Sequence, residues 1–529
     1  MMANLILRNG RIMDGTGSPW YRADLAISET RIVAMGRNLV GGAEREIDVG
    51  GLIVSPGFVD LHAHSDVTLL VNPRAESAVR QGVTTQIVGH CGFSAAPVHP
   101  ESQAALRRDS FIFAFEGYDW AWHDMAGYRA ALANAQPAIN VATLVGHGAL
   151  RQYAMGQAAR PATEQEMAVM ATELDKALAQ GARGLSSGLT YAPGRFSDTE
   201  ELIELGKVMR RHGGVYHTHM RDYSRFIMDS MGEAIRIGAE TGLPVNISHL
   251  NPPKGKDMVG ELVTFIEDAR ARGIQATFDN TIWTRGGGPY MQMLPDWAQE
   301  GGITAMKERL ANPPIRREIA RQLEEGAPDW QGWTSPNWED ALIARTGRRE
   351  HDSWCGRTIA ELAEERDLPP AEAALILLLE DDGQYWTAPE IKLQDDLNQI
   401  LSHPLSVPMS DGFALAPYGP LSQPTMPRSY GTFPRVLGRY ARDWGVLPME
   451  IAVQKMTSVP AQRMGLMDRG LLRPGLQADI TVFDPETVMD RETYQDPHAF
   501  PYGIEYVMVN GQMVVEHGKQ TEARPGQVL

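Results

Sequence analysis

The feature that most constrains the fold is a series of eight short, apolar, strand-like runs between residues 57 and 412. They are GFVDLHAH, TTQIVGHCG, NVATLVGHG, ARGLSSGL, GVYHTHMR, PVNISHL, IQATFD and PLSVPMSDG. Several are separated by stretches with helical periodicity, at residues 163–180, 198–212, 226–241 and 258–272. Strands that alternate with helices are typical of a parallel sheet, and eight of them predict an α/β fold, a closed (β/α)8 TIM barrel. A doubly wound open sheet is the alternative, which the missing glycine-rich fingerprint after the first strand disfavours.

The two ends of the chain have a different pattern, because both are β-rich. Residues 1–57 contain short alternating runs broken by Gly, Asn and Asp, and residues 465–529 contain ADITVFDPETV and IEYVMVNGQMVVEHG. Asn510-Gly511 between two alternating runs predicts a hairpin. We expect the two ends to form one small β-sandwich domain beside a barrel domain of residues 58–464. Two unrelated β-caps are the alternative.

A long segment separates the seventh strand, ending near Asp279, from the eighth, ending at Asp411. Connections in such folds are normally much shorter, so we expect an insertion at about residues 288–400. It holds six of the eleven tryptophans: Trp297, Trp330, Trp333, Trp338, Trp354 and Trp386. Either the insertion is a lid over the barrel mouth, or it is a peripheral helical unit with the tryptophans as its core.

Composition limits the class of partner. The formal net charge of −17 argues against nucleic acid and anionic membranes, which select basic surfaces. No apolar run is long enough to span a membrane, and the N-terminal residues lack the pattern of a signal peptide. Cys91 and Cys355 are the two cysteines, so we expect no disulfide framework and a cytoplasmic location. A small-molecule substrate fits these limits, and a homo-oligomer is left open.

Metal-competent side chains stand at the ends of five predicted strands. His62 and His64 form an HxH pair after the first strand, and residues two apart on a strand point to the same face. Cys91, His219, His249 and Asp411 end the second, fifth, sixth and eighth strands. Barrel active sites assemble at this edge, so the six side chains are expected to meet there. Thiolate, imidazole and carboxylate together favour zinc over magnesium or calcium. A buried structural role is the alternative for Cys91 alone.

Such a zinc site predicts a hydrolytic reaction. Zinc lowers the pKa of a bound water to about 7 and polarises the carbonyl under attack. Asp411 is the candidate to accept the water proton and pass it to the leaving amine. His90 and His217 flank the ligand candidates and are expected on the other face of their strands. His147 ends the third strand, where it could orient a ligand or contact the substrate.

The motifs VSPGFVDLHAHSD, GVTTQIVGHCGFSAAP, GARGLSSGLTYAPG, HTHMR, SHL and MSDG resemble those of the amidohydrolase superfamily, specifically the N-acyl-D-amino-acid deacylases (D-aminoacylases). The resemblance runs over most of the chain. It implies hydrolysis of an N-acyl-D-amino acid by a metal-bound hydroxide, with Asp411 as general acid and base. It also implies a tight zinc site at Cys91, His219 and His249, and a second, weaker site at His62, His64 and Asp411. The cysteine would replace a carbamylated lysine, which the fourth strand lacks.

The resemblance is less complete around the substrate. Tyr191 resembles a family residue near the substrate carbonyl, and Arg221 matches the arginine of the HMR motif. In relatives, a lysine after the strand-six histidine, a tyrosine and a serine hold the substrate carboxylate. Leu250-Asn251, Thr281-Ile282-Trp283 and Gly286-Gly287 stand at those places here.

Because these carboxylate-binding residues differ here, the sequence leaves open whether the substrate carries a carboxylate. Asn251, Trp283 and Arg285 are candidate substrate contacts, and Arg285, Lys254 or Lys256 could supply the missing cation. Otherwise the substrate is a neutral amide, a carbamate or a cyclic amide. A non-enzymatic scaffold is a further alternative, which the complete set of six ligand candidates disfavours.

Overall fold

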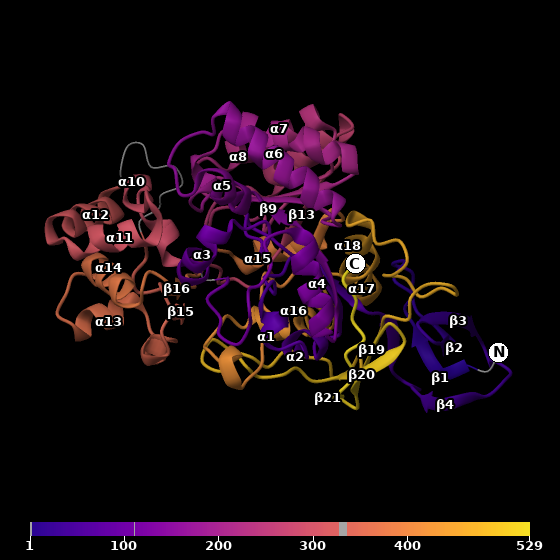
Figure 1. Ribbon diagram of the computed structural model, residues 1–529. Coiled ribbons are helices and arrows are strands. Elements are labelled where there is room, and N and C mark those ends of the chain that lie inside the picture. Colours follow the sequence, from indigo (N-terminus) through magenta and orange to yellow (C-terminus); the bar gives the residue numbers. More distant parts are fainter. Residues whose placement is uncertain (1–2, 111, 327–335) are drawn as a thin grey trace.

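The centre of the molecule is a closed ring of parallel strands. The computed structural model describes residues 3–110, 112–326 and 336–529 (Figure 1). The ring contains β6 (Phe58–Asp60), β7 (Val83–Val88), β8 (Asn140–Thr143), β9 (Val145–Gly146), β10 (Gly184–Gly188), β11 (Val215–His219), β12 (Val245–Ile247), β13 (Ala276–Asn280) and β17 (Ser406–Pro408). Parallel pairing runs from β6 through β7 to β8, and from β9 through β10, β11, β12 and β13 to β17. Leu144 alone separates β8 from β9, and a parallel bridge between Ala63 and Gly412 closes the ring. The predicted (β/α)8 barrel is confirmed.

The helices predicted from periodicity form outside this ring. The structure has α6 (Glu164–Ala179), α7 (Thr199–His212), α8 (Ile227–Thr241) and α9 (Val259–Ala271) at the expected places. Thr163 and Glu166 make a capping box at the start of α6, and Asp198 accepts a hydrogen bond from the backbone N–H of Glu201 at the start of α7. None of the helices in the described ranges combines the length and apolar character needed to cross a bilayer.

Further helices complete the layer around the strands or lie in its loops. They are α1 (Thr68–Val71), α2 (Glu76–Val79), α3 (Gln103–Asp109), α4 (Met125–Ala135), α5 (His147–Met155), α15 (Gln394–Ser402), α16 (Arg428–Arg435), α17 (Met449–Met456) and α18 (Ser458–Arg463). The helix α15 lies at the end of the expected insertion, but it packs against α9 and β17 as a barrel helix does.

Strands from both ends of the chain share one nine-stranded sheet. Its members are β1 (Ala3–Ile12), β2 (Tyr21–Ser28), β3 (Arg31–Gly36), β4 (Ala43–Asp48), β5 (Ile53–Pro56), β18 (Ile480–Phe483), β19 (Ile504–Val509), β20 (Gln512–Glu516) and β21 (Lys519–Gln520). The two ends join where β5 pairs antiparallel with β18. The predicted hairpin at Asn510-Gly511 forms, since Val509 pairs with Gln512. We propose residues 1–57 and 465–529 as one domain and residues 58–464 as the barrel domain.

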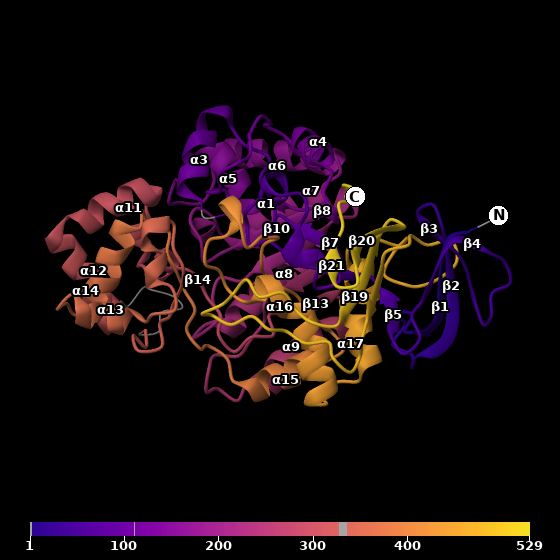
Figure 2. The same ribbon diagram turned by 90° about the horizontal axis from the view of Figure 1, so that it is seen from below.

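The insertion lies on the opposite side of the barrel from β1–β4 (Figures 1 and 2). It contains β14 (Gly288–Pro289), α10 (Asp296–Gln299), α11 (Gly302–Ala311), α12 (Pro313–Glu325), β15 (Ile343–Arg345), α13 (Ile359–Glu365), α14 (Pro370–Glu380) and β16 (Trp386–Thr387). Trp354 is buried in the insertion's own core, against which Trp297 and Trp338 pack, whereas Trp386 joins the barrel core. Trp330 and Trp333 lie outside the described residues.

Candidate metal centre and cavity

Strand ends deliver all six predicted ligands to one edge of the barrel. His62 and His64 follow β6, His219 is the last residue of β11, and the other three follow β7, β12 and β17. Cys91, His249 and Asp411 have positive φ angles of 53°, 39° and 47°. Left-handed backbone is uncommon and strained for residues other than glycine, and such strain collects at functional sites. Each strand therefore turns sharply where its ligand candidate points inward.

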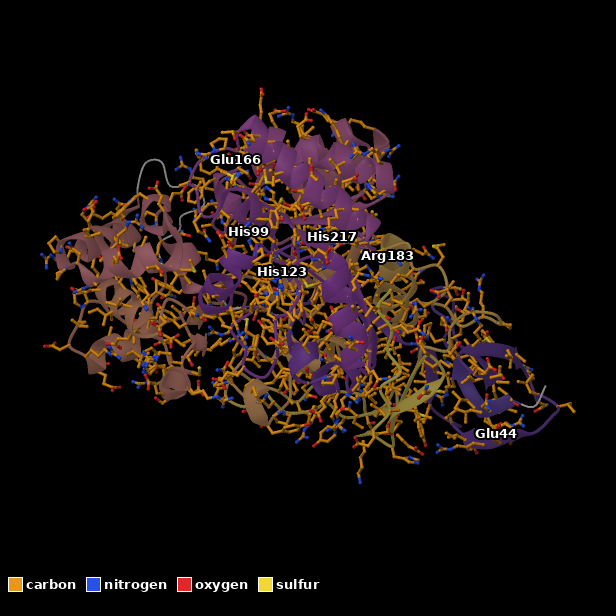
Figure 3. All side chains as sticks on the ribbon, in the orientation of Figure 1. Glu44, His99, His123, Glu166, Arg183 and His217 are labelled. Atoms are coloured by element: carbon orange, nitrogen blue, oxygen red, sulfur yellow. The ribbon has the colours of Figure 1, made fainter. Side chains whose placement is uncertain are left out.

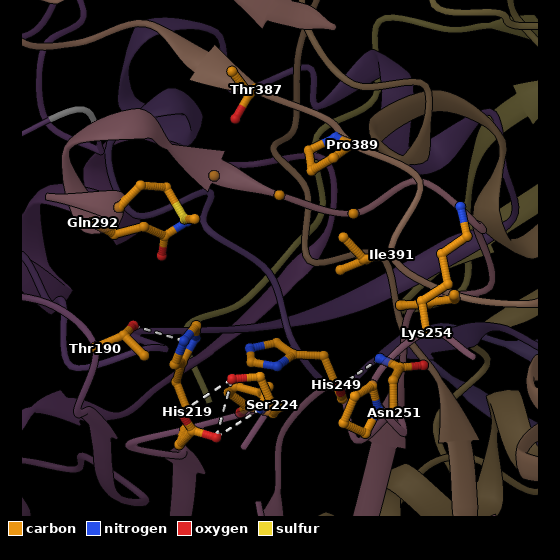
Figure 4. A pocket seen from close by; sticks show the side chains of 18 of the residues that line it. Thr190, His219, Ser224, His249, Asn251, Lys254, Gln292, Thr387, Pro389 and Ile391 are labelled. Carbon is orange, nitrogen blue, oxygen red and sulfur yellow. Dashed lines mark hydrogen bonds between the residues drawn. The ribbon is translucent and has the colours of Figure 1, made fainter. Parts of the chain in front are cut away.

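The six side chains form two groups that share the thiol of Cys91. One group is His62, His64, Cys91 and Asp411, the other is Cys91, His219 and His249, and the ligand atoms of each group lie within 4.8 Å of one another. The Cys91 sulfur is 3.3 Å from His62 Nε2 and 3.7 Å from His249 Nε2. The His64 Nε2 atom is 3.0 Å from Asp411 Oδ1. Figure 4 shows His219 and His249 facing each other in the cavity.

The chemistry of these donors fits a divalent metal ion. The ring atoms His64 Nδ1 and His219 Nδ1 are buried and have no hydrogen-bond partner in the described part of the chain. Burial alone would raise the pKa of Cys91, but the charge of His62 and hydrogen bonds from the surrounding histidines hold it well below its usual range. A thiolate among imidazoles is a zinc-type donor set. Both groups could therefore hold an ion.

Asp411 is an ionised carboxylate at the edge of these groups. Its Oδ2 atom is 2.9 Å from Arg428 Nη2, and its Oδ1 atom faces His64. Burial alone would raise the pKa of Asp411, but the charge of Arg428 and the hydrogen bond with His64 hold it well below its ordinary value. The carboxylate is thus available as a proton acceptor.

Polar side chains inside the barrel, on the side of the ligand candidates away from the cavity, contact these candidates and hold them in place. Asp279 accepts a hydrogen bond from the His249 backbone N–H at 2.6 Å and lies 3.6 Å from His62 Nδ1. The His90 ring stacks on His62 with centroids 4.0 Å apart, and His217 lies edge-on to His90 at 5.0 Å. Burial lowers the pKa of His217 to about 3 and that of His90 well below its usual range, so both rings are neutral.

The expectation that His217 lies on the other face of its strand is wrong. His217 and His219 are two residues apart on β11, so they share a face, and the His217 ring lies edge-on to His90, which stacks on His62. Figure 3 labels the position of His217 among the side chains of the barrel. His90 also lies inside, because the chain has left regular strand geometry after Val88. The rule that successive side chains point to opposite faces applies only to residues within a regular strand.

A cavity of about 1000 Å³ opens above the two groups, and five of the six ligand candidates line it. Of the predicted substrate contacts, Tyr191, Arg221 and Asn251 line the cavity. The Tyr191 ring lies 4.8 Å from that of His219, and the Asn251 amide donates to the His249 carbonyl at 2.7 Å. Arg221 pairs with Glu233 at 2.9 Å. The insertion supplies the opposite wall, including Thr387, Pro389 and Ile391 (Figure 4).

The other three predicted substrate contacts lie outside the cavity lining. His147 is buried and makes a 2.7 Å contact with Glu201, which also pairs with Arg151. The Arg435 guanidinium lies 4.1 Å from the centre of the Trp283 ring. Arg285 pairs with Asp340 at 2.7 Å, which ties the barrel to the insertion. Each of these side chains has protein neighbours that give it a structural role.

Two buried cations of the cavity wall were missed by the sequence reasoning. Arg428, at the start of α16, pairs with Asp411. Lys392, at the end of the insertion, points its Nζ atom at Thr281 and Asn280. Arg428 begins the helix that follows Asp411, so its position in the sequence is only a weak indication that it lies near the site. No local pattern marks Lys392, since only the tertiary fold brings the insertion to the strand ends.

The closed barrel and the thiolate, imidazole and carboxylate groups at its carboxyl edge define a metal-dependent barrel hydrolase. The chain belongs to the amidohydrolase family, whose model matches residues 45–515. It is 35% identical over 530 residues to D-aminoacylase of Alcaligenes xylosoxydans xylosoxydans, covering 99% of this chain and 97% of that protein.

Two solved structures are similar over the whole chain. One is a D-aminoacylase studied for its binuclear metal centre, at 33% identity and a TM-score of 0.82, covering 100% of this chain and 99% of that one. The other is N-acyl-D-glutamate deacylase from Bordetella bronchiseptica, in complex with zinc and a phosphonate mimic of the tetrahedral intermediate. It is 30% identical with a TM-score of 0.84, and both chains are covered completely. These relatives agree with the resemblance seen in the motifs.

Proposed function

We propose that this chain is a zinc-dependent deacylase that hydrolyses the amide bond of an N-acyl-D-amino acid, releasing a carboxylate and a D-amino acid. The observation that carries this proposal is the convergence of Cys91 with four histidines and Asp411 below a single large cavity. The full-length similarity to D-aminoacylase and to N-acyl-D-glutamate deacylase supports the substrate class.

We assign the tight zinc site to Cys91, His219 and His249, and a second, weaker site to His62, His64 and Asp411. When bound there, a zinc ion would make water acidic enough to ionise near neutral pH and would polarise the scissile carbonyl. The thiolate of Cys91 lies between the two sites and contributes to both. The histidines beneath it stay neutral and keep the ligands in place.

The protein groups around the site supply proton transfer and orientation. Asp411 accepts a proton from the attacking water and delivers it to the leaving amine, which requires an ionised carboxylate next to the reacting atoms. Burial raises the pKa of Tyr191 well above its usual range, so its hydroxyl stays protonated. We assign Tyr191 as a donor to the substrate carbonyl oxygen. The substrate is a small molecule, and the absence of a disulfide at Cys91 and Cys355, both of which are described residues, fits a reducing cytoplasm.

A neutral amide, a carbamate or a cyclic amide is the second candidate substrate. The observation that favours it is the loss of the carboxylate-binding residues of relatives at Leu250-Asn251, Thr281-Ile282-Trp283 and Gly286-Gly287. The two candidates differ in whether the cavity must neutralise an anion.

The test is hydrolysis of a substrate panel by zinc-loaded enzyme. The panel pairs N-acetyl-D-amino acids with their L enantiomers, with the corresponding carboxamides and with hydantoins. The proposal expects the highest kcat/KM for D-amino acid derivatives that carry a free carboxylate. Preference for carboxamides or hydantoins would favour the second candidate, and no hydrolysis by zinc-loaded enzyme would contradict both.

A further inference from the structure

The cavity wall carries more basic side chains than its carboxylates neutralise. Arg221 and Arg428 pair with Glu233 and Asp411, at 2.9 Å each, and Lys254 pairs with Glu390 at 3.2 Å. Arg225 and Lys256 also line the wall, but both are exposed, so water screens their charge.

Lys392 differs from all of these cations. Its side chain lines the cavity, the residue is only 3% exposed, and within the described ranges no carboxylate forms an ion pair with it. A buried charge without a counter-ion is costly, and proteins rarely keep one unless it has a task.

The ammonium group of Lys392 is held by neutral acceptors. The Nζ atom donates to the Thr281 carbonyl at 3.0 Å, to Asn280 Oδ1 at 3.3 Å and to the Thr281 hydroxyl. The backbone N–H groups of Ile391 and Lys392 both bind the Thr284 carbonyl, which fixes the loop that carries the side chain. The protons of the ammonium are therefore satisfied by neutral acceptors, and none of its direct partners among the described residues is a carboxylate.

The position of this group relates it to the metal ligands. Asn280 is the last residue of β13 and directly follows Asp279, which accepts from the backbone N–H of His249. The Asn280 amide also binds Asn251 Oδ1 at 3.0 Å. Lys392 thus reaches, from the insertion, the same strand ends that position His249. Burial, together with the charge of Arg428, lowers the pKa of Lys392 to about 7, against the opposing effect of the more distant carboxylates of Asp411 and Asp279.

We propose that Lys392 binds the carboxylate of the N-acyl amino acid, and so makes this enzyme select acids over neutral amides. The inference rests on the proposed deacylase function and names the residue that determines its substrate class. In an N-acyl amino acid one carbon separates the carboxylate from the amide nitrogen, so the anion must bind close to the metal ligands. A carboxylate there would supply a counter-charge in direct contact with Nζ, in a desolvated site where charge-assisted hydrogen bonds are strong.

The test compares Lys392→Met with the wild-type enzyme on two matched substrates. These are an N-acetyl-D-amino acid and its carboxamide, which differ only in the charge at the carboxyl position. Methionine keeps the length of the side chain and removes its charge. We expect kcat/KM for the acid to fall at least about 10²-fold, largely through KM, and kcat/KM for the carboxamide to change by less than about 3-fold. The Lys207→Met variant, which removes an exposed cation of α7 outside the cavity lining, should leave both substrates within about 3-fold.

The outcomes separate this inference from the function on which it rests. An equal loss on acid and carboxamide, with unchanged zinc content, would give Lys392 a purely structural role and overturn the inference, while the deacylase function stands. An unchanged preference for the acid in Lys392→Met would also overturn it. If the wild-type enzyme hydrolyses neither compound, the proposed function fails first, and the inference fails with it. If Lys392→Met does not fold, Lys392→Gln is measured in its place, with the same expected selectivity.

Discussion

At the scale of single residues, Cys91 is the side chain on which the site depends most. Its sulfur belongs to both ligand groups, and its backbone has the left-handed conformation that turns the chain inward after β7. The sequence predicted all six ligand candidates, because each follows a recognisable strand. It could not predict Lys392 or Arg428, because their places depend on how loops and the insertion fold back over the barrel.

Replacing Cys91 by alanine should remove the tightly bound metal. The Cys91→Ala variant should retain less than about a tenth of the wild-type zinc, since a thiolate ligand of both groups is lost, and kcat/KM should fall at least about 10²-fold. Elemental analysis by mass spectrometry measures the zinc. Cys355→Ala is the matched control, because Cys355 lies in the insertion and should leave both values unchanged. Full zinc content in Cys91→Ala would place the tight site elsewhere.

Replacing Asp411 by asparagine tests proton transfer separately from metal binding. Asparagine keeps the shape of the side chain but cannot accept a proton, so kcat should fall about 10²–10⁴-fold. Zinc held by Cys91, His219 and His249 should remain, because Asp411 does not belong to that group. Steady-state kinetics and metal analysis on the same sample check both expectations. Near-normal kcat would mean that another base accepts the proton.

At the scale of elements, apolar runs predicted the eight strands, which are buried almost throughout. Periodicity predicted the four long helices, since each buries one face in the core. It failed where regular geometry ends, as at His90, or where alternation was misapplied, as at His217. The insertion gave no pattern that could distinguish a lid from a peripheral unit. In the structure the insertion has its own core and also supplies a wall of the cavity.

The hairpin between β19 and β20 allows a test at this scale. Gly511 has a φ of 78°, and a Cβ atom added there would lie 1.9 Å from the carbonyl oxygen of Glu29. Gly475 has a φ of 92°, but a Cβ atom there would meet nothing within 4 Å. Alanine at either position costs roughly 1 kcal/mol for its backbone conformation, so the clash should add to the cost only in Gly511→Ala.

Thermal unfolding of the two variants measures this difference. We expect the melting temperature of Gly511→Ala to fall further than that of Gly475→Ala, while activity at 25 °C is kept in both. Equal melting temperatures would mean that the turn moves freely away from Glu29, and that the register of this sheet does not depend on the contact.

At the scale of the whole molecule, strands from both ends of the chain share one sheet on one side of the barrel. The insertion lies on the opposite side of the barrel. The returning C-terminal segment places Glu492 against α16, where it is 3% exposed. Burial and the neighbouring carboxylate of Asp490 raise the pKa of Glu492 to about 7. A carboxyl group whose pKa is raised on folding stabilises the fold below its ordinary pKa, and this contribution is lost as the pH rises through about 7.

Glu492→Gln should therefore change the pH dependence of stability. Relative to the wild type, its melting temperature should rise by about 1–3 °C between pH 5.5 and pH 8, because glutamine removes the cost of an ionised, buried carboxylate. Calorimetry at the two pH values measures the shift, with Glu308→Gln as an exposed control. A difference that stays constant with pH would show that Glu492 does not titrate in this range.

The central claim is that Cys91 and the histidines at the strand ends bind a zinc ion. X-ray absorption spectroscopy at the zinc edge of the purified enzyme tests it most directly. The account predicts one sulfur neighbour at about 2.3 Å with nitrogen or oxygen neighbours at about 2.0–2.1 Å, and loss of the sulfur shell in Cys91→Ala. A bound zinc surrounded only by nitrogen and oxygen in the wild-type enzyme would contradict it.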